Sequence, residues 1–495
     1  MTRPSNAWVE IQAARRPHDE AVAWRGNSVD WFELRERAES LARRLDSALA
    51  SRPRVVALLA RPSLRFLEVL HAAQLAGVTL APLPARGTEA DWQRILASTK
   101  PGLVLHGSEF DEVAARLGRT AGGRWLDVDA GLDREPAGRG SLAPILPDHA
   151  WLLVHTSGTT GVPKAVELRN DQLAAAAAAV IERLGCRPGE RWLAAMPMHH
   201  VGGLSVPVRA AVGGLGVVLH EGFDACAVRR SLDADAVAWV SLVPTMLASV
   251  LDVAPGEPAP RALRGAILGG GRLPPRLVDR AAGLGWPLVA TYGMTETAAQ
   301  VTTSHERDAS AHPGSAGHPL RGIELRIDSP DPDGVGEILL RGTQVSSGHR
   351  AGGAGAAETA RDDWLRTGDL GRLDDEGRLW VETRRTDLVV TGGENVRPEE
   401  IEDLLLEHPG VVDAGVFAVE DEHWGQLVAA ALVVAPDAPN DDELATWCRA
   451  RLPGFKVPRR WIRLDRLPRN AAGKLERLRL RRLAAPSSEA TVGER

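Results

Sequence analysis

A short segment of this chain has side chains and backbone groups that are suited to holding phosphate. It runs from Thr156 to Lys164 and reads TSGTTGVPK. Its two glycines let the backbone approach an anion closely, and its four hydroxyl groups can donate hydrogen bonds to phosphate oxygens. Backbone N–H groups can add further donors, and Lys164 adds a positive charge. The segment therefore predicts a polyphosphate site.

This segment differs from the Walker A loop in its sequence and in its neighbours. A Walker A loop reads Gly-x-x-x-x-Gly-Lys-Ser/Thr and opens directly into a helix. Here an apolar run, Trp151–His155, precedes the loop, and a second extended run, Lys164–Leu168, follows it. A helix starts only at Asn170–Asp171. We expect the loop to join two strands, with a flexible surface loop as the alternative when the segment is considered alone.

Two later motifs follow predicted strands and can hold other parts of a nucleotide. Gly269-Gly270-Gly271 lets a flat base lie against the backbone, and Thr291–Thr297 (TYGMTET) offers Tyr292 for stacking. Glu296, close to hydroxyl groups in the same motif, is suited to Mg²⁺ held between phosphates. The glycine run by itself is equally consistent with an ordinary turn.

Motifs nearer the C-terminal end add charged groups. Asp369 follows a glycine in Thr367–Leu370 (TGDL), where a carboxylate can accept hydrogen bonds from both hydroxyls of a ribose. Arg384 can pair with this carboxylate or with the ribose. Lys474 ends the motif LPRNAAGK on a glycine-led turn that opens a basic helix. Only four of the 59 basic residues are lysines, and the others are arginines. A lysine retained in such a chain indicates that its position requires a compact ammonium group, which favours a functional role for Lys474. A solvent-exposed turn aspartate and a solvent-exposed lysine are the alternatives.

Histidines and cysteines give no metal motif. His199 and His200 lie in MPMHHVGGLS, and adjacent side chains do not easily bind one ion. No carboxylate follows them at the spacing of a zinc motif, so we expect one histidine to line a cavity and the other to be structural. The cysteines are far apart in the sequence and predict reduced thiols: Cys186, Cys226 and Cys448.

Composition is that of a soluble globular protein with several structural units. The chain has 495 residues, of which 44% are hydrophobic and 25% charged. A net charge of −6 provides no general attraction to nucleic acid or to anionic membranes. Neither a bilayer-crossing apolar run nor a signal-peptide core is present in the sequence. We expect a cytoplasmic protein with small-molecule ligands, no nucleic-acid partner and no membrane insertion, and we leave a homodimer open.

The order of predicted elements indicates an α/β fold with two parts. Short apolar strands alternate with helices over the first part, which predicts a large, multi-layered N-terminal body of mixed sheets and helices. Near residue 384 a compact helix–strand–strand–helix–strand unit begins and ends in a basic helix from Gly473, which predicts a small, mobile α+β C-terminal cap. We divide the chain into residues 1–383 and 384–495.

Taken in this order, the motifs resemble those of the adenylate-forming (AMP-binding) superfamily, which includes acyl-CoA synthetases, adenylation domains of peptide synthetases and luciferases. The resemblance extends over essentially the whole chain. It implies a ligase that uses ATP, Mg²⁺ and coenzyme A in two half-reactions. A carboxylate first attacks the α-phosphate of ATP to give an acyl-adenylate and pyrophosphate, and a thiol then attacks the adenylate and releases AMP.

The resemblance also implies roles for individual residues. The phosphate loop holds the β- and γ-phosphates, Glu296 holds Mg²⁺, and His200 contributes to catalysis and to the acyl pocket. Lys474 is the catalytic lysine of adenylation, where a fixed cation stabilises developing charge. The implied nucleotide-binding residues are Thr156, Ser157, Gly158, Thr159, Thr160, Gly161, Lys164, Gly269, Gly270, Gly271, Thr291, Tyr292, Gly293, Met294, Thr295, Asp369 and Arg384.

In the family the cap turns about a hinge between the two half-reactions, which predicts a hinge near residues 384–387 here. That movement withdraws Lys474 and brings Thr391–Asn395, with Gly392 and Gly393, toward the path of the thiol. Two positions depart from the usual pattern. Thr383 stands where a glycine is common, and Thr386 stands where a charged hinge residue is common. We expect these changes to affect thioester formation and not nucleotide binding.

Within the superfamily the chain is most similar to the o-succinylbenzoate–CoA ligases of menaquinone biosynthesis. The matching segments are MPMHHVGGLSVPVR (196–209), YGMTETAAQ (292–300), GSAGHP (314–319) and 452–460. An arginine at the position of Arg209 binds the substrate's carboxylate in that subfamily. An unreacted carboxylate needs such a cation, because burying it unpaired is costly. A solvent-exposed helix position for Arg209 is the alternative.

Other functions stay open at this stage. Another acyl- or aryl-CoA synthetase for a simple hydrophobic acid is the main rival, and a free-standing adenylation enzyme that loads a carrier protein is a second. A nucleotide-binding pseudoenzyme is the non-enzymatic alternative. It predicts loss of Lys474, Asp369 or Glu296, and all three residues are present.

Overall fold

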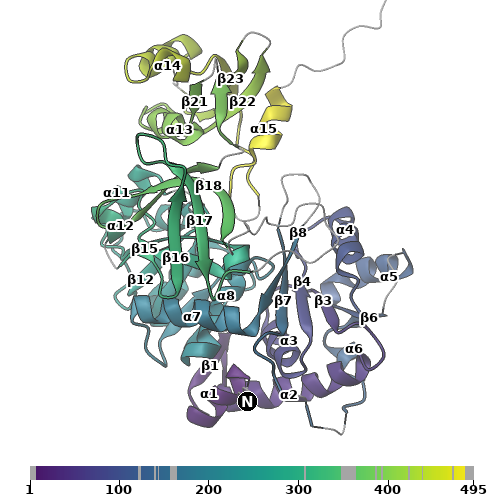
Figure 1. Cartoon of the computed structure of the whole chain (residues 1–495). Coiled ribbons are helices and arrows are strands. Elements are labelled where there is room, and N and C mark those ends of the chain that lie inside the picture. The colour runs from purple at the N-terminus through teal and green to yellow at the C-terminus, as the bar shows by residue number, and fades with distance from the viewer. Residues whose placement is uncertain are drawn as a thin grey trace, which may run out of the picture. The chain divides into compact units, whose positions relative to one another are not determined.

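Figure 1 presents the computed structural model of the chain, coloured from purple at the N-terminus to yellow at the C-terminus. It combines helices and strands in an α/β fold, as expected. Among the residues described, no helix has both the length and the apolar character needed to cross a membrane. The structure describes residues 7–120, 124–138, 141–142, 144–156, 164–271, 273–305, 308–346, 364–384, 387–391, 394–421, 424–436, 439–470 and 473–484.

Two sheets form most of the N-terminal part. The first has nine strands in the order β15-β14-β13-β12-β11-β9-β10-β1-β2, parallel from β13 to β1, with antiparallel strands at both edges. Parallel strands place their carboxyl ends at one edge, where ligands gather in open α/β sheets. Its strands are β1 (Glu20–Trp24), β2 (Asn27–Asp30), β9 (Arg191–Ala194), β10 (Gly216–Leu219), β11 (Val237–Leu242), β12 (Gly265–Leu268), β13 (Leu288–Met294), β14 (Ala299–Thr303) and β15 (His318–Pro319).

The second sheet has six strands in the order β6-β5-β3-β4-β7-β8, and only its last pair is antiparallel. Its central strands are buried along their whole length, as expected where helices cover both faces. In Figure 1, β3, β4 and β7 run side by side. Its strands are β3 (Val55–Leu59), β4 (Thr79–Pro82), β5 (Leu103–His106), β6 (Arg124–Asp127), β7 (Ala150–Thr156) and β8 (Lys164–Arg169).

Several helices of this part begin at capping residues that the sequence provides. The Ser63 hydroxyl accepts a hydrogen bond from the Phe66 amide at 3.1 Å, and the Asp30 carboxylate accepts one from Glu33 at 2.8 Å. These helices are α1 (Trp8–Arg15), α2 (Trp31–Ala48), α3 (Leu64–Leu75), α4 (Glu89–Thr99), α5 (Asp111–Thr120), α6 (Ala130–Asp133), α7 (Asn170–Leu184), α8 (Val201–Gly213), α9 (Ala225–Ala234), α10 (Pro244–Asp252), α11 (Pro275–Gly283) and α12 (Asp308–Ala311), with 3₁₀ turns η1 (Ser108–Phe110) and η2 (Thr295–Thr297).

The remaining elements form two sheets, and those after residue 384 include the elements that the sequence predicts there, with one different helix start. A four-stranded sheet has the order β16-β17-β18-β19, and β22 and β23 form a long antiparallel pair in the last sheet. The basic helix starts at Arg477 and not at Gly473, because Asn470–Lys474 forms a turn of its own. The elements are β16 (Ile323–Asp328), β17 (Gly336–Gly342), β18 (Leu365–Leu373), β19 (Leu379–Arg384), β20 (Val389–Thr391), β21 (Glu394–Val396), α13 (Pro398–Leu406), β22 (Val411–Asp421), β23 (Gly425–Val434), α14 (Asp441–Arg449), η3 (Gly454–Lys456), β24 (Arg460–Arg463) and α15 (Arg477–Ala484).

By density of contacts the chain divides into two units. One comprises residues 1–326 and 339–366, and the other comprises residues 327–338 and 367–495. Each has buried apolar residues of its own, with Val240 and Leu247 in the first unit and Val416 and Leu432 in the second. A hydrophobic core in each unit is what separate compact domains require.

A buried ionic network joins three segments of the second unit. Arg477, which is 9% exposed, lies with its Nη2 2.7 Å from Glu402 and 3.1 Å from Glu399. Its Nη1 is 3.4 Å from Asp387, and its Nε donates to the Val416 carbonyl at 2.9 Å. The network therefore connects α13, β22 and the start of α15 to one another, and it also contacts Asp387, the last residue of the expected hinge. Removing one member of such a network leaves a buried charge uncompensated.

Three carboxylates share one guanidinium in this network, and one of them takes up a proton easily. Burial raises the pKa of Glu402 from 4.5 to about 7, opposed by Arg477 and helped by the charge of Glu399. The folded protein therefore holds a proton here that the unfolded chain releases above pH 4.5. The contribution of this site to stability is complete below that pH and is lost as the pH rises toward 7.

We predict that Glu402→Gln flattens the pH dependence of stability in this unit. From pH 5 to pH 8 the wild-type unit should lose on the order of 3 kcal/mol through this group, and the variant should lose less than half of that. Hydrogen exchange of the β22 amides, corrected for intrinsic rates, measures this free energy. Glu420→Gln, at an exposed position of β22, is the matched control and should follow the wild type. Equal slopes for Glu402→Gln and wild type would contradict the assignment.

Candidate active site

The phosphate loop connects two antiparallel strands, as the sequence predicts. Thr156 ends β7 and is paired with Lys164, which begins β8. The Thr156 hydroxyl lies 3.5 Å from the Lys164 carbonyl oxygen. The predicted phosphate-binding residues Ser157, Gly158, Thr159, Thr160 and Gly161 lie outside the described residues. The strand pair thus fixes the two ends of the loop at the carboxyl edge of the second sheet.

The glycine run and the TYGMTET motif lie side by side at the carboxyl edge of the first sheet. Gly269–Gly271 follows β12, and β13 is the parallel neighbour of that strand. A Cβ on Gly269 would come within 2.9 Å of the Thr291 methyl group, and Gly270 has a φ of +76°. Small residues are therefore required where the run passes β13. Tyr292 is half-buried on β13, next to this run.

A tight corner follows Tyr292 and joins β13 to β14. The backbone at Gly293 passes so close to β14 that an added Cβ would lie 1.7 Å from the Ala299 carbonyl oxygen. Ala298 and Ala299 have φ values of 53° and 100°, which L-residues rarely adopt. The Thr297 hydroxyl stabilises this backbone, because it donates to the carbonyls of Met294 and Ala299, each at 3.0 Å. The corner places Glu296 in the turn η2 and Gln300 on β14.

A segment that sequence reasoning missed holds this corner in place. The buried Gln344 side chain donates to the carbonyls of Thr297 and Gln300. The Ser346 amide donates to the Glu296 carbonyl at 2.6 Å, and its hydroxyl lies 3.3 Å from the Glu167 carbonyl on β8. Residues 344–346 therefore connect the turn that carries Glu296 to the strand that begins at Lys164. No composition signal marks these residues, since their function is in long-range hydrogen bonds.

Asp369 lies on β18 in a locally ordered turn. It is 5% exposed, and its backbone amide donates a hydrogen bond to the Thr367 hydroxyl at 3.0 Å. The Thr367 hydroxyl in turn donates to the Ile338 carbonyl at 2.8 Å. Arg384 is the antiparallel partner of Asp369 across β18 and β19. The backbone therefore brings together the two residues that were expected to hold a ribose.

Lys474 lies in a turn with several hydrogen bonds in the second unit. Its amide donates to the Asn470 side chain at 2.9 Å, and its carbonyl accepts from the Asn470 amide at 2.9 Å. Gly473 has a φ of +74°, a conformation that favours glycine. Arg469 pairs with Leu475 in an isolated bridge and contacts Asp413 at 2.9 Å. The turn therefore fixes the backbone of Lys474. Thr386, Gly392 and Gly393, the predicted hinge and thiol-path residues, lie outside the described residues.

The adjacent histidines precede α8, and their rings lie against each other with centroids 4.1 Å apart. Burial lowers the pKa of His199 to about 3, helped by His200, and burial also lowers the pKa of His200. Both rings are therefore neutral at physiological pH. The Nε2 atom of His200 is buried, and none of the described residues forms a hydrogen bond with it. A neutral imidazole with a free nitrogen can bind a ligand but carries no charge.

A cavity lies beside α8 and contains the side chain that the sequence singled out. It has an empty volume of about 240 Å³, which includes open solvent. Arg209 lines it and is 4% exposed, so the alternative of a solvent-exposed helix position is wrong. Apolar side chains make up most of the remaining wall. The lining residues are Leu173, Ala176, Ala177, Val180, Ser205, Val208, Arg209, Ala298, Ala299 and Gln300.

The Arg209 guanidinium is a buried cation without a carboxylate among the described residues. It donates to the Ser205 hydroxyl and lies over the Trp192 ring with Cζ 4.5 Å from the centroid, while its Nη1 has no described partner. Burial lowers the pKa of Arg209 to about 10. Burial also raises the pKa of nearby Cys186 to about 12, so this thiol stays neutral and does not compensate the charge. A buried cation of this kind is suited to an anionic ligand.

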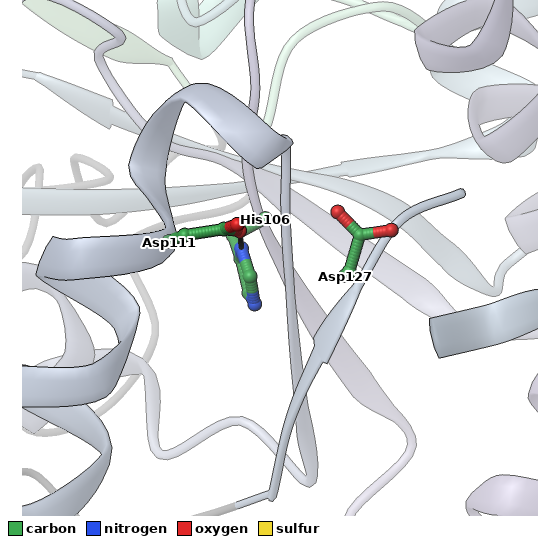
Figure 2. Close-up of side chains that lie close together, drawn as sticks. All are labelled: His106, Asp111 and Asp127. Atoms are coloured by element: carbon green, nitrogen blue, oxygen red, sulfur yellow. Dashed lines mark ion pairs between the residues drawn. The ribbon is translucent and has the colours of Figure 1, made fainter. Parts of the chain in front are cut away.

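A cluster of a histidine and two aspartates lies elsewhere, at the carboxyl edge of the second sheet (Figure 2). His106 and Asp127 are direct partners on β5 and β6. The His106 Nδ1 lies 3.5 Å from Asp111 and 3.2 Å from the Gly107 carbonyl. Asp127 accepts hydrogen bonds from the amides of residues 129 and 130 at 3.1 and 2.7 Å. Strand register and turn hydrogen bonds thus account for the grouping, and we assign no ligand to it.

We predict that Gly293→Ala disrupts the corner between β13 and β14. Its Cβ meets backbone atoms at 1.7 Å, which requires a backbone shift and should destabilise this unit by about 3 kcal/mol or more. The melting temperature and hydrogen exchange of the β14 amides measure the effect. Gly283→Ala is the matched control, because nothing lies within 4 Å of its added Cβ at the end of α11. A Gly293→Ala variant as stable as this control would refute the steric constraint.

Family models match most of the chain. The model described as AMP-binding enzyme matches residues 9–349, and the one described as AMP-binding enzyme C-terminal domain matches residues 400–474. The two matched ranges include the phosphate loop, the TYGMTET motif and Lys474. The first range also contains residues 344–346, whereas Asp369 lies between the two ranges.

Full-length relatives and solved structures agree with these matches. The chain is 35% identical over 485 residues to a 2-succinylbenzoate–CoA ligase of Bacillus cereus, covering 96% of this chain and 98% of the relative. It superposes on o-succinylbenzoate CoA synthetase (MenE) from Bacillus subtilis in complex with the acyl-adenylate intermediate OSB-AMP, with a TM-score of 0.89, 32% identity and 99% of each chain covered. The same synthetase with ATP and magnesium ion gives a TM-score of 0.88 and 33% identity, covering 96% of this chain and 99% of that one. The chain thus belongs to the AMP-binding enzyme family.

Proposed function

We propose that this protein is an AMP-forming acid–thiol ligase whose acid is o-succinylbenzoate, as in menaquinone biosynthesis. One carboxylate of the acid attacks the α-phosphorus of ATP, so that an acyl–phosphate bond forms and pyrophosphate leaves. The thiol of coenzyme A then attacks the acyl carbon, which forms the thioester and releases AMP and a proton. The observation that carries the choice of acid is the buried Arg209 guanidinium in the cavity wall.

The nucleotide requires groups that hold each of its parts. We assign the ends of the phosphate loop, Thr156 and Lys164, to the β- and γ-phosphates, and the glycine run with Tyr292 to adenine. The exposure of this run supports the assignment, because the half-buried Gly269 and the exposed Gly270 leave backbone accessible to a flat base. Asp369 is assigned to the ribose, and its opposite position to Arg384 supports a joint role of the two residues.

Glu296 fits the role of a magnesium ligand. Its carboxylate provides the hard oxygen that Mg²⁺ requires, and its turn is held by Ser346 next to the strand that starts at Lys164. Magnesium would neutralise charge on the leaving pyrophosphate. The chain's own contribution is to fix the carboxylate beside the phosphate loop, since a preorganised group needs no rearrangement as charge develops.

The acid is held by the cavity beside α8. An acid with a second carboxylate must bury that charge, and Arg209 can donate to it from Nη1, the atom that has no described partner. The neutral His200 lies at the start of the same helix and is assigned to the acyl group. A simple hydrophobic acid would leave the guanidinium uncompensated, which disfavours the rival acyl-CoA synthetases.

The second half-reaction requires movement of the C-terminal cap. We assign the hinge to residues 384–387 and the cap to residues 384–495, and we propose that its rotation withdraws Lys474 before the thiol enters. The network of Arg477 and Asp387 supports this, because it ties the last residue of the hinge to the helix after Lys474 within one unit. Cytoplasmic location and a homodimer stay predictions.

The choice of acid predicts a clear preference in a substrate panel. Wild-type protein with ATP, Mg²⁺ and coenzyme A should form pyrophosphate and thioester with o-succinylbenzoate at a kcat/KM at least about 100-fold above that for benzoate or hexanoate, since an unpaired buried charge is costly. Pyrophosphate release and mass spectrometry of the thioester provide the measurement. Good activity with a monocarboxylic acid and none with o-succinylbenzoate would reject this substrate.

The role of Lys474 predicts a separation of the two half-reactions. Lys474→Ala should lower the rate of adenylate formation by about 100-fold or more, since a fixed cation is lost where charge develops. Thiolysis of supplied acyl-adenylate should stay within a few-fold of wild type. Lys456→Ala, which removes a lysine bound to Glu400 at 2.7 Å, is the matched control. Equal loss of both half-reactions in Lys474→Ala would contradict the assignment.

A further inference from the structure

Gln300 contributes a second polar side chain to the cavity that contains Arg209. It lies on β14 and is 6% exposed. Both of its side-chain polar atoms, Oε1 and Nε2, are buried, and neither has a partner among the described residues. A buried amide without partners is costly, because it loses its hydrogen bonds to water. The cavity wall therefore contains two polar side chains with buried atoms that lack a partner among the described residues, Arg209 at Nη1 on α8 and Gln300 at both amide atoms on β14.

The chemistry of this pair favours a carboxylate over other ligands. Arg209 supplies a charged donor, and the Gln300 amide supplies a neutral donor at Nε2. A carboxylate has two oxygens and can accept from both at once. Apart from Ser205, which Arg209 contacts, the rest of the wall is apolar, with Leu173, Val180 and Val208 among its residues, so the carboxylate should be attached to an apolar or aromatic body.

The tight corner fixes the position of Gln300 relative to the TYGMTET motif. Its carbonyl accepts a hydrogen bond from Gln344, and its strand partner is Gly293. Ala298 and Ala299, which lie between the TYGMTET motif and Gln300, have the strained φ values of the corner. Gln300 therefore moves together with the turn that carries Glu296. The distance between the activated carboxylate and the second one is set by backbone and not by a flexible loop.

We propose that Gln300 is a specificity-determining residue that binds, together with Arg209, the carboxylate of the acid that is not activated. The inference rests on the proposed function and names a residue to which that function assigns no role. Arg209 provides the positive charge, and Gln300 provides a neutral hydrogen-bond donor that orients the carboxylate. An acid that lacks the second carboxylate gives no acceptor to Arg209 Nη1 or to the Gln300 amide.

The first experiment compares a two-carboxylate acid with matched monoacids. Gln300→Met keeps the volume and removes the amide, and it should raise the KM for o-succinylbenzoate about 10- to 100-fold, the usual effect of losing a hydrogen bond to a charged group. The kcat and the KM for ATP should stay within about three-fold of wild type. The monoacids 4-oxo-4-phenylbutanoate and 2-butanoylbenzoate each lack one of the two carboxylates. For whichever of them the enzyme converts, the KM of the variant should differ from that of wild type by less than it does for o-succinylbenzoate.

Two further variants keep the test decisive. Gln300→Glu places a like charge beside the bound carboxylate, so it should raise the KM for o-succinylbenzoate more than Gln300→Met does. Arg209→Met combined with Gln300→Met should cost less than the product of the single effects, because both side chains bind one carboxylate. Val208→Ala is the control in the same wall, and it should change diacid and monoacids alike. An unchanged KM for ATP and melting temperature report that each variant is folded.

The outcomes separate the two proposals. Wild-type protein without activity on o-succinylbenzoate overturns the proposed function and this inference together. Active wild type with a Gln300→Met variant that loses diacid and monoacids equally, or with fully multiplicative effects in the double variant, overturns the inference alone. A selective loss of the diacid with coupling to Arg209 supports it.

Discussion

The close approach of two backbones at Gly293 is the constraint on which the candidate site depends. No side chain fits between this residue and the Ala299 carbonyl, so β13 and β14 meet at a distance that only glycine permits. The corner beyond it contains Ala298 and Ala299 in strained conformations, which the surrounding hydrogen bonds must maintain. One rigid turn thereby carries the carboxylate of Glu296 on one side and the Gln300 amide on the other. In the function that we propose, nucleotide chemistry and acid recognition share this turn.

The segment 344–346 explains how that strain persists. Its side chains and amides bond to η2, β14 and β8, all of which are far away in the sequence. A strained backbone relaxes unless several contacts determine it at once. These contacts also connect β8, the strand that begins at Lys164, to β14 in the cavity wall. The arrangement is therefore preorganised before any ligand binds, which is the condition under which fixed dipoles and charges contribute most to catalysis.

Electrostatics is the basis of the selectivity that we propose for the cavity. The Arg209 guanidinium has a hydroxyl and the face of Trp192 as neighbours, and neither supplies a negative charge. Burial lowers the pKa of Arg209 only to about 10, so the group is still charged at neutral pH. A neutral pair of histidines at the start of α8 adds polarity without charge. The balance favours an anion as the missing partner, and it disfavours an apolar acid by the cost of an uncompensated charge.

The sequence by itself determined the reaction class and most of the elements. The TSGTTGVPK and TYGMTET motifs consist of residue types whose local chemistry requires no distant neighbour, and the strands around them follow from apolar runs with turn residues at their ends. The start of α15 was misplaced, because Asn470 forms a local turn that competes with the helix.

Only the tertiary structure decided which residues meet. It placed Arg209 in a cavity wall, where a solvent-exposed position was the alternative, and it brought Gln300 and Gln344 into the site from strands and loops with no motif of their own. Burial and long-range hydrogen bonds depend on the packing of elements far apart in the chain. The pattern along one segment specifies its own conformation, but it does not specify what lies against it.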